Sequence, residues 1–232
     1  MESNSIMKND PVQWQEDYAD IRVDAYVLLA ALLRQPPAKP LLDVLTDMQW
    51  ENAVPGKLNH AFEALRQAGR DYRLEKVIDE YNKLFVGVGV GEIVPYACWY
   101  KEKKIQSRLL AVLRADLMKL GIIRQTTWHE SEDHAGALCE IMAIISQTPV
   151  SIPYVTQQKF FEQHLGSWMI NFFKDVQSAK SAEFYRTVGL FGERLLETEK
   201  TFLQFGAKHK HFMMEGESYN EDQLFERPTN IF

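Results

Sequence analysis

The side chains best suited to acid–base or metal chemistry gather in one short run near the middle of the chain, His129-Glu130-Ser131-Glu132-Asp133-His134. Ser131 has the side chain of a helix N-cap, and Glu132 and Asp133 then fall in the first turn, where carboxylates favour the helix dipole. On such a helix Asp133 and His134 diverge by about 100°, so they do not clamp a metal ion as an i, i+4 pair does. The spacing therefore predicts no metal site here.

His134 carries the clearest structural expectation within this run. It continues the apolar row of Leu138, Ile141 and Ile145 on the predicted helix, which directs its ring towards the core. A buried imidazole must find a hydrogen-bond partner. The sequence leaves two roles open: a histidine that pins the loop before its helix, or a histidine that contacts a ligand.

A glycine run, Gly87-Val88-Gly89-Val90-Gly91, invites comparison with phosphate-binding loops. A dinucleotide loop needs a strand before it and a helix after it, so that backbone amides and a helix N-terminus meet the phosphates. Here a helical pattern precedes the run, Pro95 follows it, and no Lys-Ser or Lys-Thr pair completes a P-loop. The context favours a plain loop from Val86 to about Trp99, with a nucleotide cradle as the minor alternative.

The remaining reactive side chains give no catalytic signature. Cys98 and Cys139 have no base placed beside them by the sequence, so we expect small buried hydrophobes. His164 lies on an apolar stripe and is expected at or near the core, and the run Lys101-Glu102-Lys103-Lys104 is expected to be a solvated helix start. There is no Gly-x-Ser-x-Gly nucleophile elbow. The sequence thus predicts no catalytic residues, no metal and no cofactor.

The segments that must position these residues are helical, because apolar residues recur at spacings of three and four rather than two. Their stripes predict helices over the ranges 14–32, 41–50, 58–69, 77–87, 105–120, 131–147, 160–173 and 184–205. Prolines and glycines separate these stripes, and Gly121 suits the left-handed position after a helix. We therefore predict an all-α protein with a single helical-bundle domain.

Length and charge limit the class of protein. The 232 residues suffice for a sizeable core. A formal charge of −6 gives no general electrostatic attraction to nucleic acid or to an anionic membrane. The polar start lacks the pattern of a secretory leader, and no stretch reaches the roughly 20 apolar residues that span a bilayer. We expect a soluble, cytoplasmic protein that binds no nucleic acid and does not insert stably into a membrane.

The domain layout follows from the same patterns. We expect a flexible N-terminus over residues 1–13, one helical domain over 14–205, and a polar, flexible or partner-binding tail over 206–232. The proline-bounded segment 149–153 could serve as a hinge for domain swapping. A monomer and a domain-swapped homo-oligomer therefore both stay open.

Three separated motifs occur in order along residues 20 to 205. The first is Tyr81-Asn82-Lys83-Leu84-Phe85-Val86-Gly87, followed by Pro95-Tyr96-Ala97-Cys98-Trp99-Tyr100. The second is Glu130-Ser131-Glu132-Asp133-His134, and the third is Phe161-Glu162-Gln163-His164-Leu165 with Trp168, followed by Phe184-Tyr185. Together these motifs resemble those of the TorD/DmsD/NarJ family of redox-enzyme maturation chaperones. Ser131 departs from the proline, and Cys98 from the serine, that are common in the family.

The resemblance implies an all-helical cytoplasmic chaperone that binds the twin-arginine leader, or the apo form, of a molybdenum- or tungsten-containing oxidoreductase until its cofactor is inserted. A receptor for such a leader needs an apolar groove beside acidic groups, because the leader has a basic start and an apolar segment. The resemblance assigns client binding to the motif residues Tyr81, Leu84, Phe85, Gly87, Pro95, Tyr100, Glu130, Asp133 and His134. For Leu84 and Phe85, packing in the core is an equal alternative.

Two other functions remain as alternatives. One is a chaperone for a molybdoenzyme subunit that is not exported, which would bind the catalytic subunit rather than a leader. The other, from a different class, is a nucleotide-binding switch that uses the glycine run and the Asp133-His134 turn.

Overall fold

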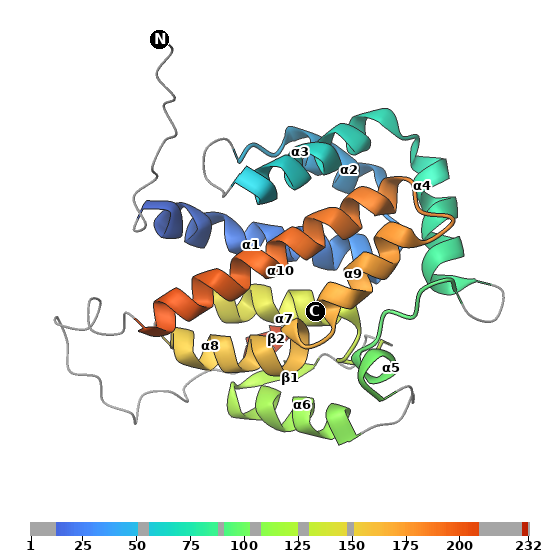
Figure 1. Ribbon diagram of the computed structural model, residues 1–232. Helices are drawn as coiled ribbons and strands as arrows, with labels where there is room; N and C mark the ends of the chain where they lie inside the picture. The colour runs from blue at the N-terminus through green and yellow to red at the C-terminus, as the bar shows by residue number, and fades with distance from the viewer. Residues whose placement is uncertain are drawn as a thin grey trace, which may run out of the picture.

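The computed structural model describes residues 13–50, 56–87, 91–102, 108–124, 130–147, 151–208 and 229–231, and these ranges are dominated by helices (Figure 1). The α-helices are α1 (Gln13–Arg34), α2 (Lys39–Asp47), α3 (Gly56–Asp71), α4 (Leu74–Tyr81), α5 (Ala97–Glu102), α6 (Arg108–Lys119), α7 (Ala135–Gln147), α8 (Tyr154–Phe161), α9 (Met169–Ser178) and α10 (Phe184–Lys208). Two short π-helical turns also occur, η1 (Asn82–Val86) and η2 (Glu162–Gly166). The predicted all-α helical bundle is confirmed.

Helix α10 is the centre of the packing. It contacts α1, α3, α8 and α9, and α1 in turn packs along α7. In Figure 1, α10 crosses the molecule diagonally, with α2 and α3 above it and α5 and α6 at the lower edge. The apolar stripe of α10 is buried over most of its length, as its periodicity predicts.

A buried ion pair fixes α1 against α10 and α8. Arg22 pairs with Glu199, and its Nη1 donates to Gln157 Oε1 at 2.9 Å. The Tyr18 hydroxyl also donates to Glu199, at 2.9 Å. These groups are almost without solvent contact, so each depends on the others for its hydrogen bonds.

The first turn of α10 is capped by a side chain distant in the sequence. The Glu80 carboxylate of α4 accepts the backbone N–H groups of Glu183, Phe184 and Tyr185 at 2.7–3.0 Å. These are orphan donors of a helix N-terminus, where negative charge is favourable. Although burial raises the pKa of Glu80, the three bonds oppose that rise.

A small parallel ladder accompanies the helices. Strand β1 (Ile122–Arg124), which follows Gly121 in the left-handed conformation at φ 68°, pairs with β2 (Thr229–Ile231). Helix α10 continues to Lys208, two residues past the start of the predicted tail at residue 206, and strand β2 also falls within that tail. Residues 209–228 and 232 lie outside the described ranges, as do residues 1–12.

The structure corrects three local predictions. Helix α7 begins at Ala135, so Ser131 is not its N-cap and Glu132 and Asp133 precede its first turn. The loop predicted up to Trp99 ends earlier, because α5 already begins at Ala97. Lys101 accordingly lies at the end of a helix rather than at its start, whereas residues 103–107 are outside the described part of the chain.

The predicted helix over 160–173 is also interrupted. It is divided into α8, η2 and α9, with a turn at Ser167 and Trp168 between the last two. Among the described residues, none of the helices combines the length and apolarity needed to cross a membrane.

Candidate functional site

Two loops that are distant in the sequence are joined by backbone hydrogen bonds. The Ala135 N–H donates to the Pro95 carbonyl at 2.8 Å, and the Ala97 N–H donates to the Asp133 carbonyl at 3.0 Å. Tyr96 and His134 form an antiparallel bridge between these bonds. The structure therefore brings together the second half of the first motif and the whole of the second.

Asp133 caps helix α5. Its carboxylate accepts the N–H of Cys98, the second residue of α5, at 3.1 Å, and the hydroxyl of Ser131 at 2.6 Å. The side chain is 3% exposed. Since α5 also carries Trp99 and Tyr100, Asp133 positions the aromatic residues of this region through the helix that it caps.

The two glutamates of the second motif are engaged within the fold. Glu132 is buried and accepts two hydrogen bonds from Arg114, at 3.0 and 2.9 Å, while Arg124 lies 3.7 Å away. Burial opposes ionisation of Glu132, but the hydrogen bonds from Arg114, a backbone hydrogen bond and the charges of Arg114 and Arg124 together lower the pKa of this carboxyl. Glu130, which is half-buried, accepts the hydroxyl of Tyr96. Glu132 is therefore already neutralised by arginines of this chain.

His134 is buried, as the row of apolar residues predicts, and its Nδ1 accepts the N–H of Gly136 at 3.1 Å. The edge of the Tyr96 ring packs against it at a centroid distance of 5.1 Å. Burial lowers the pKa of His134 to about 4, although Glu130 opposes this shift. The ring is therefore neutral at pH 7, with its proton on Nε2 because Nδ1 acts as an acceptor.

The first π turn buries most of its motif. Leu84 has no solvent exposure, and Tyr81 is buried with its hydroxyl donating to the Leu33 carbonyl at 3.1 Å. Phe85 is partly exposed and packs against the rings of Tyr81 and Tyr185 at 5.1 and 5.3 Å. Gly87 ends the turn at φ 62°, a conformation that favours glycine. Residues 88–90 of the predicted glycine loop lie outside the described part of the chain.

A solvent-open cleft of about 390 Å³ lies beside this turn, between the segment 91–94, α5 and the C-terminal end of α9. Its lining combines aromatic, small apolar and acidic residues: Gly91, Glu92, Ile93, Val94, Trp99, Tyr100, Asp175, Ser178 and Ala179. The Tyr100 hydroxyl donates to Asp175 Oδ2 at 2.8 Å. Burial, together with that hydrogen bond to a carboxylate, raises the pKa of Tyr100, so the hydroxyl stays a donor.

The nine residues assigned to client binding thus fall into two groups. Tyr81, Leu84, Pro95, Asp133 and His134 are buried, whereas Phe85, Gly87, Tyr100 and Glu130 are partly exposed. Only the second group is open to a partner without rearrangement of the fold. Of these nine, Tyr100 alone lines the cleft.

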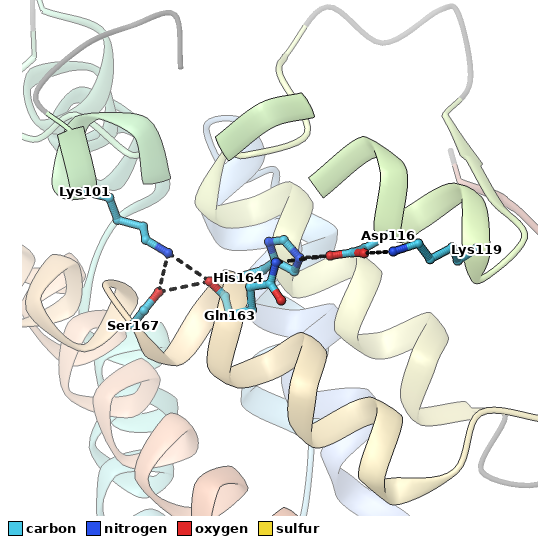
Figure 2. A network of polar contacts seen from close by, with 6 residues as sticks. All are labelled: Lys101, Asp116, Lys119, Gln163, His164 and Ser167. Atoms are coloured by element: carbon cyan, nitrogen blue, oxygen red, sulfur yellow. Dashed lines mark hydrogen bonds and ion pairs between the residues drawn. The ribbon is translucent and has the colours of Figure 1, made fainter. Parts of the chain in front are cut away.

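The third motif forms the second π turn and is tied to its neighbours by a polar network (Figure 2). His164 Nε2 lies 3.0 Å from Asp116 Oδ2 of α6, and Lys119 donates to the other oxygen of Asp116 at 2.8 Å. From the other side Lys101 of α5 donates to the Gln163 carbonyl and to Ser167 Oγ, each at 3.0 Å. His164 is buried at the edge of the core, as predicted. Through these hydrogen bonds its turn contacts both α5 and α6.

The cysteines are the inert hydrophobes that the sequence predicts. Both are buried, and burial raises the pKa of the Cys98 thiol to about 12, with a further contribution from Asp133. Within the described ranges, no three or more His, Cys, Asp or Glu side chains are grouped so as to hold a metal ion. His129, the first residue of the run His129–His134 considered for metal binding, lies outside those ranges.

Of the residues that line the cleft, Trp99, Glu92 and Asp175 carry aromatic or acidic side chains that the sequence does not assign to binding. Trp99 stands inside the first motif but was treated only as the end of a loop. Glu92 and Asp175 are single carboxylates with no motif around them, and only the tertiary arrangement places them at one opening.

Comparison with known proteins gives concordant matches. The family model described as nitrate reductase delta subunit matches residues 51–174, which is more than half of the chain. A probable Tat proofreading chaperone DmsD from Haemophilus influenzae is 23% identical over 192 residues, covering 79% of this chain and 91% of the relative. A chaperone protein TorD from Shewanella loihica is 26% identical over 167 residues, covering 67% of this chain and 74% of the relative.

Proposed function

Since this chain belongs to the nitrate reductase delta subunit family, the TorD/DmsD/NarJ group of redox-enzyme maturation chaperones, we propose that it holds one specific molybdenum- or tungsten-containing oxidoreductase before export. In this proposal it binds the twin-arginine leader, the apo catalytic subunit, or both, in the cytoplasm. Release follows insertion of the client's cofactor. Residues 14–205 form the chaperone domain.

The observation that best supports this proposal is the position of the cleft. It lies where the first motif of the family continues into α5, and it offers apolar and aromatic surface next to carboxylates. A leader with a basic start and an apolar run needs both kinds of surface. Among the motif residues, Phe85, Gly87, Tyr100 and Glu130 are proposed to contact the client directly, because they are the partly exposed ones.

The buried motif residues have a positioning role in the proposal. Asp133 holds α5, and His134 holds the bridge to Tyr96, so that both act on the client through the elements they fix. Changes at these positions should therefore lower stability as well as binding, whereas a change at Tyr100 should mainly lower binding.

The proposed mode of action is occupancy without turnover. A chaperone that binds one client state more tightly than another shifts their populations only by that difference in affinity. The yield of cofactor-loaded client should consequently rise with the concentration of the chaperone and saturate.

Affinity capture with the full-length chain from its native host tests the proposal. Recovery of an oxidoreductase whose sequence begins with paired arginines before an apolar run is the expected result. Recovery of a molybdoenzyme without such a leader would favour the non-exported client instead. Recovery of neither class, together with nucleotide binding in calorimetry, would support the nucleotide switch and contradict the chaperone.

A further inference from the structure

Two of the three acidic residues of the second motif, Glu132 and Asp133, are not available to an arginine-rich partner. Glu132 is buried against Arg114 and Arg124, and Asp133 is buried as the cap of α5. A guanidinium could reach either carboxylate only by breaking contacts that hold the fold. The carboxylates that line the cleft are Glu92 and Asp175, both exposed, and among the described residues of its lining there is no Lys, Arg or His.

We propose that Asp175, with the exposed Trp99, is the binding site for an arginine guanidinium of the client's leader, and that the partly exposed Val94 and Ala179 receive the apolar residues that follow it. This inference rests on the proposed function and names the residues of this chain that recognise the leader. They lie outside the three motifs, except for Trp99.

Asp175 is held in place for this task. Its Oδ2 accepts the Tyr100 hydroxyl, and the Tyr100 ring is itself fixed against Trp168 at a centroid distance of 5.3 Å. A carboxylate has about four acceptor positions, so one hydrogen bond leaves room for the paired N–H groups of an arginine. Because the carboxylate is already oriented, binding loses little side-chain freedom.

Trp99 adds a surface that favours arginine over lysine. Its side chain is 37% exposed and lines the same cleft as Asp175. A planar guanidinium can stack on an indole ring while two of its N–H groups donate to one carboxylate. A lysine ammonium is not planar and cannot form this paired hydrogen bond. The site is thus expected to discriminate between two cations of equal charge.

Glu92 has a smaller part in this site. It already accepts the N–H and hydroxyl of Ser181, and Lys180 lies close enough to offset part of its charge. Its contribution should be a general attraction that salt screens, rather than a direct bond.

Calorimetric titration tests this assignment with a synthetic peptide that carries an adjacent arginine pair followed by a run of leucine and alanine. A second peptide has lysines in place of the arginines. Asp175→Asn keeps the shape of the side chain and an acceptor for Tyr100, and it should weaken binding of the arginine peptide about tenfold, the effect of losing a charge-assisted bond. Trp99→Leu should remove the preference for arginine over lysine.

Asp24→Asn on α1 is the matched control, because it removes one exposed aspartate that does not line the cleft. It should bind the arginine peptide as the wild type does. Circular dichroism and melting temperature on every variant verify that each is folded, and Glu92→Gln gives a second, weaker test of the same opening.

The outcomes separate this inference from the proposed function. If the wild type binds the arginine peptide and Asp175→Asn binds it equally well, the cleft is not the arginine site although the chaperone proposal stands. Equal binding of the arginine and lysine peptides by the wild type would also overturn the assignment. Failure of the affinity capture from the host would instead contradict the proposed function itself.

Discussion

Replacing Asp133 with alanine should destabilise the protein by about 2–3 kcal/mol. The change removes the acceptor for the Cys98 N–H at 3.1 Å and for the Ser131 hydroxyl at 2.6 Å. Loss of a helix cap costs about 0.5–2 kcal/mol, and a buried donor left without a partner costs about 1–3 kcal/mol. Both ranges count the loss of the Cys98 N–H bond, so they cannot simply be added. The expected total is therefore the upper part of these ranges, about 2–3 kcal/mol.

Urea unfolding followed by circular dichroism measures this loss, and an unchanged m-value would locate it in the native state. For a chain of this size the same loss lowers Tm by about 4–12 °C. Amide hydrogen exchange at Cys98 should accelerate more than at residues in the middle of α10, because the cap acts on α5. Asp133→Asn, which keeps an acceptor oxygen, should lose less.

Asp79→Asn is the control for this experiment, since Asp79 is an exposed aspartate on α4 and its change should stay within about 0.5 kcal/mol of wild type. The reasoning is refuted if Asp133→Ala unfolds at the wild-type urea concentration and Cys98 exchanges at the wild-type rate. Asp133 would then be free for a direct role in binding.

Three further predictions concern the core and the pH response. The pKa of His134 is about 4 in the folded chain and about 6.5 when unfolded, so the unfolded state binds the extra proton first as the pH falls. The free energy of unfolding should therefore be unaffected by His134 above pH 7 and fall by about 3 kcal/mol between pH 6.5 and 4. In urea unfolding at several pH values, His134→Asn should remove this fall. Gly91→Ala places a Cβ against the Leu84 carbonyl oxygen and 2.7 Å from the Phe85 carbonyl carbon in the preceding π turn, and it should cost about 1–3 kcal/mol in urea unfolding, whereas Gly56→Ala, with open space around it, should stay within about 0.5 kcal/mol. Arg22→Met leaves the buried Glu199 without its partner and should cost about 3–5 kcal/mol in the same assay, most of which the double change with Glu199→Leu should restore.

The helices follow from sequence because their apolar stripes have one period and face one core. The stripes that begin at Trp14 and Phe184 predict α1 and α10 to within a few residues, as both bury a long continuous face. Proline and glycine mark most of the ends, and Gly121 adopts the predicted left-handed conformation. Periodicity could not reveal the two π turns, since a single inserted residue barely disturbs a stripe.

The start of α7 could not be predicted because a tertiary contact decides it. Ser131 and the following carboxylates have the composition of an N-terminal turn, but Asp133 and Ala135 exchange backbone hydrogen bonds with Ala97 and Pro95 instead. The residues before Ala135 instead form a turn, in which the His134 N–H donates to the Ser131 carbonyl at 3.0 Å, and His134 bridges to Tyr96. Local capping preference was outweighed by a contact with a segment almost forty residues earlier in the chain.

From the sequence, residues of the candidate site could be predicted only where they stand within one of the three motifs. The motifs point to the region of Pro95, Tyr100 and Asp133, and the structure brings these segments together. They did not distinguish side chains that face solvent from those that support the fold. The exposed carboxylate of Asp175 comes from a helix in the last third of the chain and has no neighbour in sequence to identify it.

The cofactor content of the client in a host that lacks this gene tests the central claim most directly. If the protein raises the yield of loaded oxidoreductase by occupancy, deletion should leave the client's transcript unchanged and lower its activity and its bound metal cofactor in the same proportion. Expression of the wild-type chain should restore both quantities. Normal activity and normal cofactor content of every molybdenum- or tungsten-containing oxidoreductase in the deletion strain would contradict the account.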